Sequence, residues 1–175
     1  MVPSGLSVGR QSLIILSAIS PLELYLCSRQ QFDQFAQHTC SQMASEAEQA
    51  DYLFEAVVGD FVLAFTEDNW FRAKITEILP NYRVRLDLVD TCGDADVNRN
   101  LLRKARVEVM KIPTLWTKSK LDSFCGRKEE DAIKSRDKVK ELMEAYDEVD
   151  GVVVEEEGEE EGVARVQIPS VETQL

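Results

Sequence analysis

Apolar and polar positions alternate along much of the chain and predict short strands separated by two helices. The apolar runs 12–19 and 22–27, broken at Pro21, indicate two strands. From 30 to 49 the apolar residues recur at three- and four-residue steps, which predicts a helix with one buried face. A second helix is expected over 129–146. Its expected buried side chains are Ala132, Ile133, Val139, Leu142, Met143 and Tyr146.

The middle of the chain has the pattern of a small antiparallel barrel. Apolar runs at 61–65, 70–78 and 82–88 are separated by turn-forming residues, as in consecutive β-hairpins. A turn is expected over 90–94, and 107–110 is expected to be a closing strand. Short strands at this spacing are typical of a small barrel.

The C-terminal third adds further strands. The segment 115–124 is expected to form one strand. The runs 149–154 and 162–168 flank the acidic stretch 155–161, which predicts a hairpin with a solvated tip.

Composition favours a soluble globular unit or two small interleaved ones. The 175 residues are 44% hydrophobic and 30% charged, with a net charge of −12. Residues 98–140 carry a positive excess, whereas the segments on both sides are acidic. This balance argues against a general nucleic-acid binder but leaves a local basic strip open.

The sequence does not favour a metal, cofactor or membrane function. Four cysteines lie far apart without a C-x-x-C motif, and the one histidine, His38, has no second imidazole to share a metal. We therefore expect no metal site and no cofactor. The apolar run 13–16 is too short to cross a bilayer, so no membrane association is expected.

The segment 58–75 reads VGDFVLAFTEDNWFRAKI and resembles a Tudor domain. That family has a Gly-Asp step, then an Ala-x-x-x-x-Asp turn, then Trp-Tyr-Arg-Ala at the start of the next strand. Leu88-Val89-Asp90 followed by Gly93-Asp94 resembles the later Tyr-Ile-Asp-Tyr-Gly-Asn of the family.

The flanking segments are similar to those of extended Tudor domains. The resemblance implies a mostly β fold with two helices, in which a Tudor SH3-like antiparallel barrel is inserted into an OB-like barrel related to staphylococcal nuclease (SN-like). The implied boundaries are a flexible N-terminus at 1–11, a discontinuous SN-like module at 12–55 and 113–172, and a Tudor barrel at 56–112.

Extended Tudor domains bind symmetric dimethylarginine in a cage of aromatic faces and one Asn, and the resemblance places that cage here. Phe65 and Phe71 fall on two of its aromatic positions. Leu88 and Thr91 stand where the family has tyrosines, and Asp94 or Gly93 stands where it has Asn. The cage is therefore expected to be degenerate and to give little or no preference for the methylated cation.

Acidic residues near this cage offer another way to hold an arginine. Asp90, Asp94, Glu67 and Asp68 could each give a carboxylate to an unmodified guanidinium, although surface turn acids would show the same pattern. Phe65 and Phe71 could equally be core residues. The candidate ligand-binding residues are Phe65, Phe71, Leu88, Asp90, Thr91, Asp94 and Asp68.

The resemblance implies a non-enzymatic interaction module that docks an arginine-rich peptide of a PIWI-type or other piRNA-pathway protein. It also implies a cytoplasmic scaffold, in germline granules of the nuage type. Two alternatives stay open: a self-associating structural domain with a vestigial cage, or single-stranded RNA binding by the OB-like half. The basic residues considered for RNA, with Trp116 as a stacking platform, are Arg99, Arg103, Lys104, Arg106, Lys111, Lys118 and Lys120.

Overall fold

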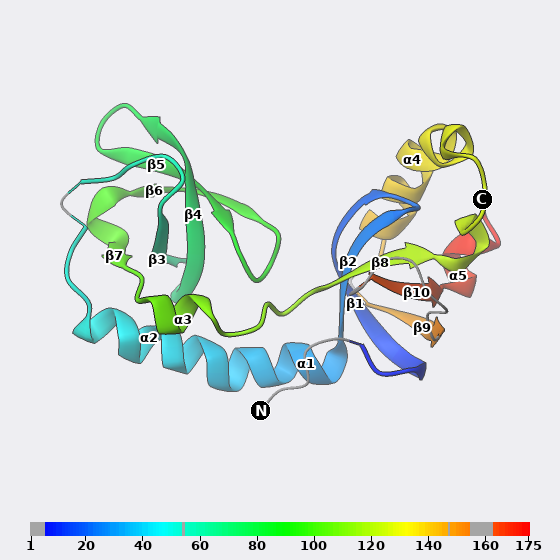
Figure 1. Ribbon diagram of the computed structural model, residues 1–175, viewed down its shortest axis with the longest axis horizontal. Coiled ribbons are helices and arrows are strands. Elements are labelled where there is room, and N and C mark those ends of the chain that lie inside the picture. Colours follow the sequence, from blue (N-terminus) through cyan, green and yellow to red (C-terminus); the bar gives the residue numbers. More distant parts are fainter. Residues whose placement is uncertain (1–5, 54, 147, 155–162) are drawn as a thin grey trace. The chain divides into compact units, whose positions relative to one another are not determined.

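The computed structural model describes residues 6–53, 55–146, 148–154 and 163–175 (Figure 1). Its contacts divide the chain into two compact units. One contains Met1–Phe32 with Leu115–Leu175, and the other contains Asp33–Thr114. The second unit is thus an insertion in the first, as the resemblance implies. None of the described helices is both long and apolar enough to span a membrane.

The first unit is built on a closed five-stranded barrel in the order β1-β2-β8-β10-β9. Its strands are β1 (Gly9–Ser20), β2 (Glu23–Ser28), β8 (Thr117–Leu121), β9 (Glu148–Val154) and β10 (Val163–Gln167). The pair β8–β10 is parallel and the other neighbours are antiparallel. The predicted strands at 12–19 and 22–27 and the C-terminal hairpin are confirmed, while the acidic stretch 155–161 lies outside the described residues.

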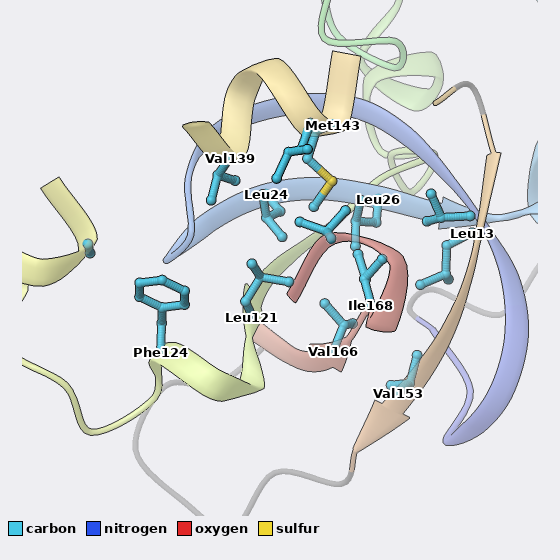
Figure 2. Packing of buried hydrophobic residues seen from close by; sticks show 14 residues of the cluster. Leu13, Leu24, Leu26, Leu121, Phe124, Val139, Met143, Val153, Val166 and Ile168 are labelled. Atoms are coloured by element: carbon cyan, nitrogen blue, oxygen red, sulfur yellow. The ribbon is translucent and has the colours of Figure 1, made fainter. Parts of the chain in front are cut away.

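The inward side chains of the barrel form one apolar core with the helix that covers it. Leu13, Leu24, Leu26, Leu121 and Val166 are fully buried there (Figure 2). Each strand supplies every second residue to this core, because side chains alternate between the two faces of a strand.

Helix α4 (Glu129–Glu144) confirms the predicted second helix, and α5 (Pro169–Glu172) is a short C-terminal turn. Val139 and Met143 of α4 point into the barrel core (Figure 2). Two members of the expected buried set are wrong, since Ile133 is 62% exposed and Tyr146 is also exposed. Ile133 lies one step away from the stripe that Val139 and Met143 define, so it faces solvent.

The predicted helix at 30–49 is also present, in three consecutive segments. These are α1 (Arg29–Gln34), the π-helical turn η1 (Phe35–Thr39) and α2 (Cys40–Gln49). Phe35, Met43 and Ala47 are buried, as the periodicity predicts. Ala36, which the same pattern places on the buried face, is exposed, and it lies in the π turn where the angular step changes.

The second unit is built on a five-stranded antiparallel sheet in the order β6-β5-β4-β3-β7. Its strands are β3 (Phe61–Thr66), β4 (Asn69–Leu79), β5 (Arg83–Leu88), β6 (Asp94–Asn98) and β7 (Leu102–Lys104), with the 3-10 turn η2 (Arg99–Leu101) before β7. The fold is mostly β, as the fold-class prediction states.

One predicted strand of this unit is wrong. Residues 107–110 form the helical turn α3 (Val107–Met110) instead of a closing strand. The closing position beside β3 is taken by β7, which pairs with Val62, Leu63 and Ala64. With that edge occupied, the segment after Arg106 closes its hydrogen bonds locally, and only Val109 of its side chains is buried.

The contacts also shift the expected limits between the units. The helical residues after Phe32, expected in the SN-like module, group with the Tudor-like sheet. Met43 and Ala47 of α2 pack there against Leu63 and Val109. Strand β1 begins at Gly9, inside the stretch 1–11 that was expected to be a flexible N-terminus.

Candidate functional site

The β3–β4 hairpin carries the first candidate residues. Its turn is made by Glu67 and Asp68, both in the left-handed region, with φ of 49° and 63°. Two consecutive residues of this kind match the type I′ turn, whose twist fits two-residue hairpins. Asp68 is therefore exposed at the hairpin tip.

The register of this hairpin places Phe65 and Phe71 on opposite faces of the sheet. Phe65 lies opposite Trp70, whereas Phe71 lies opposite Ala64. The rings of Phe65 and Trp70 are in contact, with centroids 5.4 Å apart. Because consecutive residues of a strand point to opposite faces, Phe71 points away from this pair.

Leu88 lies on the same face as Phe71. It ends β5 and is paired with Ala73, which lies two residues after Phe71 on β4. Only 8% of Phe71 and 7% of Leu88 is exposed. Leu88 is therefore a buried aliphatic residue at the end of β5, at the position where the family has a tyrosine ring.

A tight loop brings Thr91 to Leu88. The Leu88 N–H donates to the carbonyl of Gly93 across 2.8 Å, and Cys92 takes the left-handed conformation at φ 56°. A Cβ placed on Gly93 would lie 3.7 Å from both Leu88 Cδ1 and Thr91 Oγ1. The loop thus gathers Leu88, Thr91 and Gly93 into one small cluster, and Asp94 follows directly.

Asp90 does not serve as a ligand-facing acid, which corrects its place among the candidate residues. Its carboxylate accepts hydrogen bonds from Nε of Arg72, at 2.9 Å, and from Nη2 of the same side chain. Both side chains are only 1% exposed. A buried carboxylate needs such a partner, because its desolvation is otherwise very unfavourable.

Arg72 extends this pair into the chain around α3. Its guanidinium also donates to the carbonyls of Val109 at 3.0 Å, Ile112 at 2.5 Å and Pro113 at 3.2 Å. One side chain therefore fixes the loop after β5 and the end of α3 together. This role of Arg72 was not predicted from its sequence context, although the alternation of Trp70, Phe71 and Arg72 places the arginine on the face of Trp70.

The remaining acids stay accessible. Asp94 is exposed at the start of β6, opposite Asp87 of β5. Its neighbour on the same strand face, Asp96, is instead engaged by Arg85, with Nε of Arg85 3.1 Å from Oδ1 of Asp96. This hydrogen bond raises the pKa of Arg85 above its ordinary value. Asp94, Asp68 and Glu67 are thus the acids considered for an arginine that a ligand could reach.

Cys92 contributes no reactive thiol to the loop. Burial, together with the negative charge of Asp90, raises the pKa of Cys92 to about 11. The thiolate is the nucleophilic and metal-binding form of cysteine, so this thiol is unreactive at neutral pH. No group of three or more histidine, cysteine or acidic residues in the described part of the chain could hold a metal ion.

The candidate residues thus separate into two sets. The structure gathers Phe71, Leu88 and Thr91 around the loop after β5, and Asp94 follows at the start of β6, on the sheet face of Asp87; we call these four residues the loop site. Phe65 joins the aromatic contact with Trp70 on the other face, Asp90 is part of the buried ion pair, and Asp68 lies at the hairpin tip. The loop site offers one aromatic ring and one aliphatic wall on one face of the sheet, one hydroxyl in the loop, and one exposed carboxylate at the start of β6 on the other face.

The basic residues considered for RNA do not form one strip on the OB-like barrel. Lys118 and Lys120 lie on β8 of that barrel, whereas the other five, from Arg99 to Lys111, belong to the Tudor-like unit. Arg106 pairs with Glu46. The ring of Trp116 meets Tyr25 edge to face, with centroids 5.0 Å apart. This distribution does not favour the RNA alternative.

Comparison with known proteins connects this geometry to a family. The Tudor domain profile matches residues 10–123, more than half of the chain. No curated protein matches the sequence.

Solved structures with the same fold include several extended Tudor domains. The human TDRD1 extended Tudor domain, in complex with a symmetrically dimethylated peptide, is 20% identical with a TM-score of 0.61, covering 94% of this chain and 81% of that one. Extended Tudor domain TD3 of mouse TDRD1, in complex with a MILI peptide containing dimethylarginine, is 19% identical with a TM-score of 0.57, covering 94% and 84%. A complex of Tudor with dimethylated Aubergine is 13% identical with a TM-score of 0.61, covering 90% of each chain.

The profile match and the shared fold agree with the Gly-Asp motif just before β3 and the Trp-Phe-Arg-Ala motif on β4. The chain therefore belongs to the Tudor domain family, whose members are non-enzymatic peptide-binding modules.

Proposed function

We propose that the loop site docks an arginine-containing peptide of a PIWI-type or other piRNA-pathway protein, with little or no preference for symmetric dimethylarginine. The expected lack of preference for symmetric dimethylarginine rests on the environment of Leu88. Its aliphatic side chain, 7% exposed, occupies a position where the family has an aromatic face.

The energetics of a cation on an aromatic surface explain the expected loss of preference. Each aromatic face attracts a cation by about 0.5–2 kcal/mol, depending on desolvation. The loop site has one such face, Phe71, and that ring is largely buried. Without further rings, the added methyl groups of dimethylarginine gain little contact.

The exposed acid favours the unmodified side chain. A carboxylate binds a guanidinium best through two parallel N–H···O hydrogen bonds. Methylation replaces N–H donors of the guanidinium, so fewer remain for Asp94. An unmodified arginine therefore suits the loop site at least as well as a methylated one.

The comparisons support the peptide class of the ligand. The three solved structures described above are complexes with dimethylated peptides, and this chain shares their fold. We also propose that the protein is part of a cytoplasmic scaffold in germline granules. Imaging of the tagged protein in germ cells, with a granule marker, tests this location; a nuclear or diffuse distribution would contradict it.

Calorimetric titration tests the peptide proposal directly. The ligands are one Arg/Gly-rich PIWI tail peptide in unmodified form and the same peptide with symmetric dimethylarginine. We expect dissociation constants within about threefold of each other, since less than about 0.7 kcal/mol separates the two ligands. A preference above tenfold for the methylated form would contradict the role given to Leu88 and Thr91.

Two variants sharpen the test. Leu88→Tyr combined with Thr91→Tyr restores the aromatic residues at the matched positions and is expected to raise the preference for the methylated peptide. Asp94→Asn is expected to weaken binding of the unmodified peptide. Asp150→Asn, which changes an exposed acid of the other unit, serves as the matched control. Absence of binding to either peptide would favour the self-associating scaffold instead.

A further inference from the structure

One arginine of the Tudor-like unit lies against two aromatic rings. The guanidinium carbon of Arg103 is 3.8 Å from the ring centroid of Tyr52 and 5.3 Å from that of Trp70. Both distances are within the range of cation–π attraction, which extends to about 6 Å. This is the type of contact by which an aromatic site holds an arginine ligand, but here the cation comes from the chain itself.

The strand order explains how the rings come to flank this cation. Arg103 lies on β7, opposite Leu63 of β3, and forms an antiparallel bridge with Tyr52 on its other side. Trp70 lies on β4, the next strand beyond β3. It pairs with Phe65, which lies two residues after Leu63 on β3, so Trp70 and Leu63 are on the same face of the sheet. Arg103 therefore lies between Tyr52 and Trp70 in the order of the sheet.

The polar contacts of Arg103 are with backbone carbonyls. Its Nη1 donates to the carbonyls of Asn100 at 2.9 Å and Leu102 at 2.8 Å. Over the described ranges, no carboxylate forms an ion pair with it, whereas Arg72 and Arg106 each have an acidic partner. The aromatic rings and two carbonyls are thus what hold this charge.

We infer that Tyr52 and Trp70 form a second arginine-binding site, which Arg103 occupies in the free protein. A guanidinium side chain of a bound peptide takes the place of Arg103 between the two rings, and Arg103 then turns outward to solvent. Arg103 is in this way an intramolecular competitor that weakens binding at the site.

Two observations favour an arginine as the external occupant. Tyr52 is 58% exposed, so its ring is accessible from solvent. The protein carries a net charge of −12, which attracts cationic peptides over a distance and disfavours anionic ones. Phe65 lies beside Trp70 on the neighbouring strand, and the contact between the two rings helps to fix the Trp70 ring.

This second site is distinct from the loop site. Trp70 and Arg103 lie on the face opposite to Phe71 and Leu88, as the pairing of Phe65 with Trp70 and of Ala64 with Phe71 requires. The inference therefore does not depend on the proposed function, and each can fail while the other holds.

Removal of the competitor provides the test. N-acetyl-arginine amide is titrated into the wild-type protein, Arg103→Ala, and the double variant Tyr52→Ala/Arg103→Ala, with the indole N–H signal of Trp70 followed by NMR. We expect Arg103→Ala to bind at least about threefold more tightly than the wild type, with a larger shift of the Trp70 signal. The double variant is expected to lose this gain.

The outcomes separate the two sites. No gain in Arg103→Ala, or a gain that persists without Tyr52, would overturn the inference. Arg103→Gln, which keeps side-chain length without the charge, replaces the alanine variant if near-UV circular dichroism shows loss of the fold. Binding at the loop site is read independently from the methyl signals of Leu88, which titration of the second site leaves unchanged.

Discussion

At the scale of single residues, the presence of an acidic side chain marks a candidate for arginine binding but does not show whether that side chain is buried or accessible. Asp90 and Asp94 lie four positions apart and have the same side chain, yet one is 1% exposed and the other is exposed. The difference is the partner: Arg72 holds both carboxylate oxygens of Asp90. The carboxylate of a buried acid of this kind is taken up by its partner, whereas an exposed one is accessible to a ligand.

Substitution of Arg72 by Met is expected to lower the free energy of unfolding by about 3–5 kcal/mol, because it leaves the carboxylate of Asp90 buried without a partner. Urea unfolding followed by circular dichroism measures this loss. Replacing both residues, as Arg72→Met with Asp90→Leu, is expected to recover part of it.

Arg85→Met is the matched control, since the ion pairs of Arg85 with Glu77 and Asp96 are exposed. Exposed pairs contribute little, so this variant is expected to unfold close to the wild type. Equal losses for Arg72→Met and Arg85→Met would show that the buried pair has no special role.

Asp122 gives the barrel unit a pH-dependent contribution to stability. Hydrogen bonds from Gln167 and then Arg165 lower the pKa of Asp122 below its ordinary value. A lowered pKa in the folded state stabilises the protein above the unfolded pKa of about 3.9, and this stabilisation is lost as the pH falls through the lowered value. The melting temperature should therefore fall at acidic pH, and Asp122→Asn should make that fall shallower. An equal fall of the melting temperature at acidic pH in the wild type and in Asp122→Asn would contradict this role.

At the scale of elements, sequence patterns were reliable where a long amphipathic segment had one available surface. Strand β1 and helix α4 illustrate this, since most of their apolar residues pack in the core of one barrel, with Ile133 as an exception. The four residues of α3 fit either a strand or a helical turn. Their state was decided by β7, which already occupies the edge of β3.

Strand β9 has a glycine where it pairs with β1, at a position with little space for a side chain. Gly151 lies opposite Gln11, and a Cβ there would clash with Cδ1 of Leu13 and lie 3.3 Å from the carbonyl of Gln167. Leu13 is fully buried, so a shift of its side chain would disturb the packed core. Gly151→Ala is therefore expected to lower the free energy of unfolding by about 1–3 kcal/mol through overpacking.

Urea unfolding checks this prediction, with Asp150→Ala as the control on the same strand. The side chain of Asp150 is exposed, so its removal is expected to change stability little. A Gly151→Ala protein as stable as the wild type would show that the Leu13 side chain can repack.

At the scale of the whole molecule, charge favours a basic partner. The net charge is −12, and Arg72, Arg85, Arg106 and Arg165 of the described chain are each paired with an acid. The long-range field of the protein is therefore negative and attracts cationic peptides.

Binding of an unmodified Arg/Gly-rich peptide is expected to weaken several-fold when NaCl is raised from about 0.05 M to about 0.3 M, because salt screens exposed charges. Calorimetry at both concentrations measures the change. A peptide with glutamine in place of each arginine is the control. Affinity independent of salt would show that apolar contact, instead of charge, dominates binding.

Much of the architecture was predictable because it depends on local patterns. The motif at 58–75 indicated the Tudor family, and the breaks in periodicity marked most strands and both long helices. Long-range pairing was not predictable from such patterns. Tyr52 and Arg103 are brought together by a single bridge between distant segments, and no local signal announces that contact.

The sequence by itself determined the family, the mostly β fold and the absence of tyrosines at Leu88 and Thr91, since these are properties of residue type and spacing. Only the tertiary structure decided that Phe65 and Phe71 lie on opposite faces of the sheet and that Asp90 is paired with Arg72. Those outcomes depend on strand register and on which buried charge finds which partner. Both are set when distant segments pack together.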